Sequence, residues 1–154
     1  MKSLLKNMEV RVMKKETRIA IVAGKSLGNY RVYVLTVLRG KIVEGVEFYK
    51  ANSSFELSSA IISSKYYNEI RIFIVITGKD PFVNDDFYVR IAKPIILTKK
   101  LESVNEAYGL SIDEARSILN FLVKSTFLEV VEFIDKLFHE AIELLEEPMY
   151  GKEG

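Results

Sequence analysis

Cysteine is absent from this 154-residue chain, and histidine occurs only once, at His139. Without cysteine the chain forms no disulfide bond and offers no thiolate to a metal ion. One histidine, with no second histidine beside it, gives little support for a zinc site or for a histidine-based catalytic triad. The composition therefore excludes disulfide-stabilised and zinc–thiolate domains, and because the sequence shows no export signal, we expect a cytoplasmic protein.

Long apolar runs are also missing. No uninterrupted run approaches the roughly 18–20 residues that a membrane-spanning helix needs, and Lys2 and Lys6 interrupt the first residues before a signal-peptide core could form. Hydrophobic residues make up 49% of the chain and charged residues 28%, which is the balance of an ordinary globular protein. We therefore expect one domain without a membrane segment.

A strong net charge is lacking too, but the charges are unevenly distributed. The net charge is only +1, so no overall field selects nucleic acid or a membrane surface. Residues 1–50 hold 11 Lys or Arg against 4 Asp or Glu, whereas residues 128–154 hold 2 Lys against 8 Asp or Glu. Two solvated faces of opposite sign and a basic binding patch are both compatible with this distribution.

The first third of the chain predicts three strands. Residues 1–16 are basic and loosely periodic, and we treat them as an arm that precedes a single domain of residues 17–147 and a tail of residues 148–154. Apolar, β-branched and aromatic residues dominate 18–23 and 30–38, whereas 41–50 alternates between apolar and polar positions. The pattern indicates an antiparallel meander with its third strand on the outside.

Helices separate the remaining strands. Helical spacing over residues 52–62 precedes an apolar strand at 71–76, and a short helix at 85–91 precedes a strand at 94–98. A capping box at Ser111 and Glu114 begins a further helix, and a last helix is expected over 128–147. The order β-β-β-α-β-α-β-α-α predicts a ribonuclease H-like α/β fold, a mixed five-stranded sheet flanked by helices, whose later strands are parallel.

Several segments resemble one protein family. The stretch Lys65-Tyr-Tyr-Asn-Glu-Ile-Arg-Ile72 resembles a family passage from helix to fourth strand, and residues 84–96 resemble a family helix that enters the next strand. Gly109-Leu-Ser-Ile-Asp-Glu-Ala115 is similar to a family helix start, and residues 128–142 follow where the closing helix is expected. The family is the archaeal endonuclease V-like family, also described as deoxyuridine endonucleases, and the resemblance covers roughly residues 16–145.

The resemblance implies metal-dependent cleavage of DNA near a damaged base. In such chemistry, Mg²⁺ or Mn²⁺ held by carboxylates activates a water and stabilises the leaving oxygen. This chain departs from the pattern where the family's acids end strands one and four, because these places are occupied by Val22, Ala23, Ile76 and Thr77. Aliphatic side chains cannot bind a hard cation, so the departure predicts a nuclease relative without nuclease chemistry and with no cofactor.

Asp80 is the candidate catalytic residue if a metal site has moved. Asp80, Asp85 and Asp86 follow the fourth predicted strand. A turn at Asp80-Pro81 and a helix start at Asp85-Asp86 explain these acids without any metal. The alternative, an active endonuclease that uses Mg²⁺ or Mn²⁺ at a relocated site, depends on Asp80.

Four lysines near the ends of the predicted strands form a candidate nucleic-acid edge. They are Lys25, Lys79, Lys99 and Lys100. Lysine can hold phosphates without a metal ion, although solvated loop lysines explain the same residues. Lys25 belongs to a Gly-Lys-Ser string, which we interpret as a hairpin turn and not as a phosphate-binding loop, because a strand follows it and the preceding glycine is missing.

The last predicted helix carries two apolar lines. Such a width exceeds what one sheet face usually covers. Burial of both lines against the sheet is one interpretation, and a homodimer through the second line is the other. The second line consists of Phe127, Val131, Phe138 and Ile142.

These observations lead to one functional expectation and one alternative. We expect a divergent endonuclease V-like domain without catalysis, which binds DNA or RNA or serves as a protein-interaction scaffold. The active endonuclease with a relocated metal site is the alternative.

Overall fold

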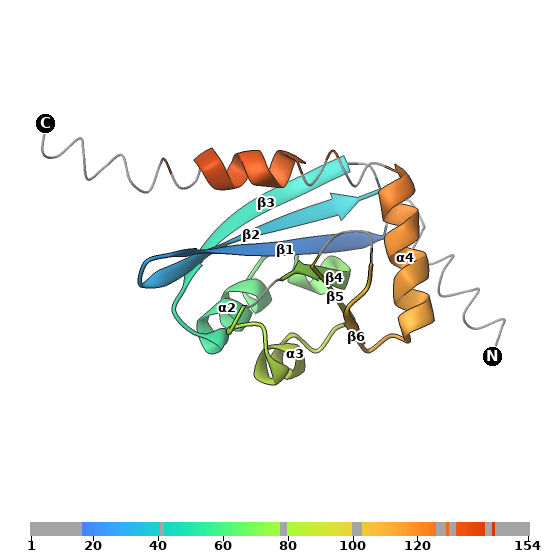
Figure 1. Cartoon of the computed structure of the whole chain (residues 1–154), viewed down its shortest axis with the longest axis horizontal. Helices are drawn as coiled ribbons and strands as arrows, with labels where there is room; N and C mark the ends of the chain where they lie inside the picture. The colour runs from blue at the N-terminus through green and yellow to red at the C-terminus, as the bar shows by residue number, and fades with distance from the viewer. Residues whose placement is uncertain are drawn as a thin grey trace, which may run out of the picture.

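A computed structural model describes residues 17–40, 42–77, 80–99, 103–125, 129, 132–140 and 143. Within them, six strands form one sheet with helices on both faces (Figure 1), and the strand order is β3-β2-β1-β4-β5-β6. The elements are β1 Arg18–Leu27, β2 Tyr30–Arg39, β3 Ile42–Ala51, α2 Ser54–Ile62, η1 Tyr67–Glu69, β4 Ile70–Ile76, α3 Asp85–Ile91, β5 Ile95–Thr98, β6 Glu106–Tyr108 and α4 Ile112–Ser125.

The meander of β1, β2 and β3 is confirmed. Both strand pairs are antiparallel, and β3 lies at the edge of the sheet. Gly28 and Gly40 adopt positive φ angles of 62° and 60° in the two hairpin turns, a conformation that glycine adopts without steric cost. The expected turn at residues 24–28 is shorter than we predicted, because residues 24–27 continue β1 and only Gly28 and Asn29 form the turn.

The parallel arrangement of the later strands is also confirmed. β4 pairs with β1, and β5 pairs with β4, both in parallel, with α2 before β4 and α3 between β4 and β5. Ser53 and Asn84 cap the two helices through hydrogen bonds from the backbone amides of Glu56 and Phe87. The first five strands therefore have an arrangement compatible with a ribonuclease H-like sheet.

A sixth strand was not predicted. β6 contains only three residues and pairs antiparallel with β5. Its sequence, Glu-Ala-Tyr, is too short for an alternating pattern to be recognised, and its position depends on pairing with Ile95, Ile96 and Leu97. The sheet is thus mixed, as expected, but has six strands instead of five.

The sheet is buried on both faces because its strands carry apolar residues on each side. On the α2–α3 face, helices α2 and α3 cover residues such as Val22, Leu35 and Val75. On the α4 face, α4 and the helical residues 132–140 cover residues such as Ile21, Val34 and Ile74 (Figure 1). Strand alternation decides which face each side chain reaches.

The helices of the α4 face agree with the prediction where the structure describes them. The expected capping box is confirmed, since Ser111 Oγ accepts from the Glu114 amide at 3.1 Å and Glu114 Oε1 accepts from the Ser111 amide at 3.2 Å. The expected closing helix is seen at residues 132–140. In the described part of the chain, no helix combines the length and apolar character that a membrane span requires.

Candidate functional site

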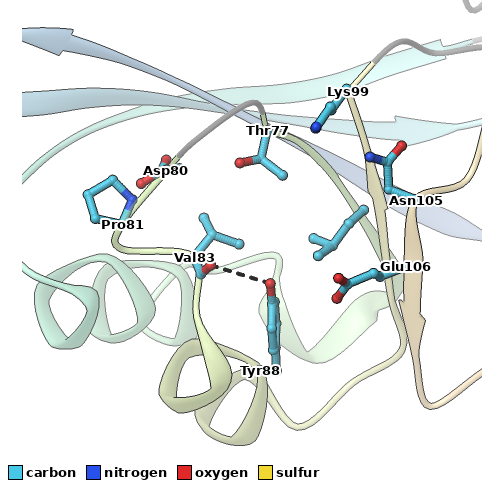
Figure 2. Close-up of a pocket in the computed structure, with 9 residues that line it drawn as sticks. Thr77, Asp80, Pro81, Val83, Tyr88, Lys99, Asn105 and Glu106 are labelled. Atoms are coloured by element: carbon cyan, nitrogen blue, oxygen red, sulfur yellow. Dashed lines mark hydrogen bonds between the residues drawn. The ribbon is translucent and has the colours of Figure 1, made fainter.

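A pocket of about 430 Å³ opens beside the carboxyl ends of β4 and β5 (Figure 2). Its volume lies within the roughly 300–1,000 Å³ typical of small-molecule sites. In open α/β sheets, ligands bind outside the carboxyl ends of parallel strands, because loops from neighbouring strands meet there. The lining residues are Thr77, Asp80, Pro81, Val83, Tyr88, Leu97, Lys99, Asn105 and Glu106.

Backbone hydrogen bonds fix the three segments that contribute polar groups. The Thr77 amide donates to the Thr98 carbonyl at 3.0 Å, which extends the β4–β5 pairing beyond the end of β4. The Asn105 amide donates to the Leu97 carbonyl at 2.8 Å, and β6 begins one residue later. Thr77 therefore comes to one edge with Lys99 and Asn105, which lie more than 20 residues later in the sequence.

The pocket also has apolar walls. Val83 and Leu97 are buried, and the ring of Tyr88 lies at the lower end of the pocket in Figure 2. Tyr88 stacks on Tyr108 with ring centroids 3.9 Å apart, and its hydroxyl donates to the Val83 carbonyl at 3.3 Å. Burial raises the pKa of Tyr88, so this hydroxyl stays protonated at ordinary pH.

Four polar side chains surround the centre of the pocket in Figure 2. They are Thr77, Lys99, Asn105 and Glu106, and they supply a hydroxyl, an ammonium, an amide and a carboxylate. Glu106 Oε2 accepts a hydrogen bond from the Tyr108 hydroxyl at 2.7 Å. This bond to a carboxylate raises the pKa of Tyr108, so the tyrosine acts as a donor that orients Glu106.

Asp80 lies opposite Glu106 and has its own partners. Asp80 Oδ1 accepts from the Tyr33 hydroxyl at 2.9 Å and from the Phe82 amide at 2.9 Å, and the Arg31 Nε lies 3.3 Å away. The side chain of Asp80 is only 5% exposed. We call Arg31, Tyr33 and Asp80 the Asp80 cluster.

Gly24 makes the Asp80 cluster possible. A Cβ atom at this position would lie 2.5 Å from Tyr33 Cε1 and 3.2 Å from Asp80 Oδ2, so any side chain would push the cluster apart. The cluster joins β2 to the loop after β4, and that loop forms one wall of the pocket. Asp80 therefore holds the wall in place, and its carboxylate is already occupied by donors from this chain.

The residues at the expected catalytic place do not fit a divalent cation. Val22 and Ala23 of β1 pair with Val75 and Ile76 of β4 in the middle of the sheet, so these positions do lie side by side. Of Val22, Ala23, Ile76 and Thr77, only Thr77 carries a side-chain oxygen, whereas Mg²⁺ and Mn²⁺ require several hard oxygen ligands. Within the ranges that the structure describes, no three acidic or histidine side chains gather as metal ligands.

The structure separates the two described lysines of the proposed edge. Lys99 lines the pocket, which lies on the α2–α3 face. Lys25 lies on the α4 face, where its Nζ is 5.2 Å from the centroid of the Phe138 ring. Lys79 and Lys100 lie outside the described residues. Of the two described lysines, only Lys99 therefore lies at the pocket.

Phe138 is a core residue in this structure. It is 2% exposed and packs in the α4-face core with Ile134. The helix at 132–140 turns Phe138 toward the sheet. In the single chain this side chain therefore agrees with burial in the core and not with an exposed dimer surface. Phe127, Val131 and Ile142 lie outside the described residues, so their part in a dimer stays a prediction.

Sequence reasoning missed five residues that contribute polar groups or aromatic rings to the site. Tyr33 and Arg31 looked like ordinary strand residues, and Tyr88, Asn105 and Glu106 belong to a short helix, a loop and a three-residue strand. The available signal in the sequence is Gly24, because a glycine in a strand can mark a place where a neighbouring side chain approaches the backbone closely. Nothing in the local pattern connects Glu106 with Lys99 or Asp80.

Comparison with known proteins gives no family. No family model matches the chain, and no curated protein matches it. A crystal structure of a protein of unknown function from Archaeoglobus fulgidus DSM 4304 is similar, with a TM-score of 0.45 and 19% sequence identity. The similarity covers 53% of this chain and 52% of that protein, so this chain spans about half of its length.

Proposed function

We propose that this chain is a non-catalytic nucleic-acid-binding domain that holds one nucleotide of a bound strand in the pocket beside β4 and β5. The observation that carries the proposal is the lining of the pocket. Lys99 supplies a cation for a phosphate, Asn105 and Thr77 supply hydrogen-bond donors, and Tyr88 and Leu97 supply apolar surface for a base or sugar.

The position of the pocket adds support. Thr77 lines the pocket. In the endonuclease V-like family that this chain resembles, an acid is expected at the position of Thr77. A nucleotide in the pocket would therefore lie next to the positions of the lost acids. Binding would be retained in this interpretation, while the chemistry that needs a metal ion would not.

The alternative, an active endonuclease with a relocated metal site, has less support. It depends on Asp80, whose carboxylate accepts from Tyr33 and from the Phe82 amide and lies beside Arg31. Binding a cation there would require breaking these interactions in a side chain that is 5% exposed. We therefore expect no cleavage of deoxyuridine- or deoxyinosine-containing DNA with Mg²⁺ or Mn²⁺. Cleavage that disappears in Asp80→Asn would establish the alternative.

Binding is tested with single-stranded DNA at about 50 mM salt, where phosphate contacts are little screened. We expect weak binding that falls steeply as salt rises. Lys99→Ala should weaken binding for all sequences and reduce the salt slope by about one. Lys136→Ala is the matched control, because Lys136 is an exposed lysine of the helical residues 132–140. If no strand binds, the nucleic-acid proposal fails and a protein partner becomes the better interpretation.

A further inference from the structure

The pocket has hydrogen-bond acceptors on two opposite sides. Asp80 lies on one side and Glu106 on the other, with Lys99 and Thr77 between them at the upper end in Figure 2. Each carboxylate oxygen can accept two hydrogen bonds and donates none. The Glu106 carboxylate therefore favours N–H groups over carbonyl oxygens on its side of the pocket, whereas Asp80 is partly balanced by Arg31.

Glu106 has an oxygen available for a ligand. Its Oε2 accepts from the Tyr108 hydroxyl at 2.7 Å, and among the described residues no hydrogen bond is made to Oε1. Tyr108 stacks on Tyr88, which itself lines the pocket, so the donor that orients Glu106 is held by the pocket wall. Glu106 is thus an exposed carboxylate with a fixed direction and spare acceptor capacity.

Asp80 contributes charge more than direct contact. Its Oδ1 accepts from the Phe82 amide and from Tyr33, and its Oδ2 shares the Tyr33 hydroxyl at 2.8 Å. Arg31 balances part of this charge from the side of the sheet. Glu106 is therefore the side chain that we assign to ligand recognition, and Asp80 is a positioning residue.

We infer that the pocket selects a nucleotide whose base carries an exocyclic amino group, with Glu106 as the acceptor of that group. The inference rests on the proposed nucleic-acid binding and names the base class that the site takes. Cytosine and uracil make the comparison simple, because they have the same size and differ mainly at position 4, an amino group in cytosine and a carbonyl oxygen in uracil. A glutamate accepts from the cytosine amino group but repels the carbonyl oxygen.

The remaining polar groups suit the rest of such a nucleotide. Lys99 and Asn105 carry donors that can reach a phosphate oxygen or the second carbonyl of the base. The Tyr88 ring and Leu97 provide an apolar surface for the flat part of the base. One ligand can therefore satisfy the cation, the carboxylate and the apolar wall together.

The test compares single-stranded oligo(dC) and oligo(dU) of equal length, measured by fluorescence anisotropy at low salt and slightly alkaline pH, where cytosine is unprotonated. We expect oligo(dC) to bind about tenfold more tightly, the fold-change expected for one well-placed base contact. In Glu106→Gln the two affinities should approach each other, because the glutamine amide can also donate to the uracil oxygen. The Tyr108 contact remains possible in this variant, so the fold should be retained.

Controls and outcomes separate this inference from the proposal on which it rests. Glu132→Gln removes the same charge from an exposed position of the helical residues 132–140 and should leave the preference unchanged. Equal binding of the two strands, tighter binding of oligo(dU), or a preference that survives in Glu106→Gln overturns the inference but leaves nucleic-acid binding intact. If neither strand binds, the proposed function itself is wrong, and the inference fails with it.

Discussion

Asp80 is a buried carboxylate whose side-chain partners, Tyr33 and Arg31, come from β2, and whose third partner, the Phe82 amide, lies in its own loop. Arg31 Nε donates to the Tyr33 hydroxyl at 3.1 Å, and Tyr33 donates to Asp80. A carboxylate removed from water is costly unless donors and an opposite charge replace the lost hydration. The Asp80 cluster supplies both, so its role is to keep the pocket wall in one position.

At this scale we predict that Tyr33→Phe destabilises the protein. The substitution removes a donor from a buried acceptor and should lower the free energy of unfolding by about 1–3 kcal/mol. Burial, followed by the hydrogen bond to Asp80, raises the pKa of Tyr33. The contribution of Tyr33 is therefore present below about pH 10, the pKa of an unfolded tyrosine, and is lost as the pH rises further.

Denaturant unfolding at several pH values measures both effects. Tyr33→Phe should be less stable near neutral pH, and its stability should fall less above about pH 10 than that of the wild type. Tyr30→Phe, at the half-buried start of the same strand, should change stability by about 0.5 kcal/mol or less. A Tyr33→Phe variant as stable as the Tyr30 control would show that the Asp80 cluster is not held by this hydroxyl.

Helix α3 shows how an element can carry an unfavourable residue at its end. Ala92, the C-cap of α3, has a φ of 55° in the left-handed region, which is disfavoured for any residue with a Cβ. Glycine normally occupies this position in helices that end in the left-handed conformation. The next strand, β5, begins only three residues later, so the chain must turn at Ala92 to bring β5 beside β4.

We therefore predict that Ala92→Gly stabilises the protein. Removing the Cβ relieves the left-handed conformation and should raise the free energy of unfolding by about 1 kcal/mol. Ala60→Gly is the matched control with the opposite sign, because Ala60 lies inside α2, where glycine costs about 1 kcal/mol. Thermal unfolding of both variants measures the difference. Equal destabilisation by the two substitutions would contradict the assigned geometry at Ala92.

The whole molecule is a sheet with one hydrophobic core on each face. The α4-face core takes Ile134 and Phe138 from the acidic end of the chain, and Lys25 from the basic half lies over the ring of Phe138. The two halves of opposite charge therefore meet at this place within one chain.

At this scale we predict that two phenylalanines of one helix differ strongly in their contribution to stability. Phe138→Ala should lower the free energy of unfolding by about 3–5 kcal/mol, because the ring is 2% exposed in the core. Phe133→Ala should change it by about 0.5 kcal/mol, because Phe133 is 39% exposed. Sedimentation equilibrium of both variants reports on association. A dimer that Phe133→Ala dissociates would show that the outer side of this helix contacts a second copy.

Local pattern explains why much of the fold was predictable. Alternation and β-branched residues mark β1 to β3, and helical spacing with Ser53, Ser111 and Glu114 marks the starts of helices. These signals depend on neighbours a few residues apart. The three-residue β6 was missed because its conformation depends on pairing with β5 and not on its own residues.

The sequence by itself determined the α/β class of this protein, the order of its first five strands and the aliphatic character of Val22, Ala23 and Ile76. Tertiary structure alone decided the site. Lys25 in β1 and Lys99 just after β5 lie on opposite faces of the sheet, and chain folding brings Glu106 across from Asp80. The physical reason is range: periodicity and capping act over a few residues, whereas a pocket is made of side chains that only packing brings together.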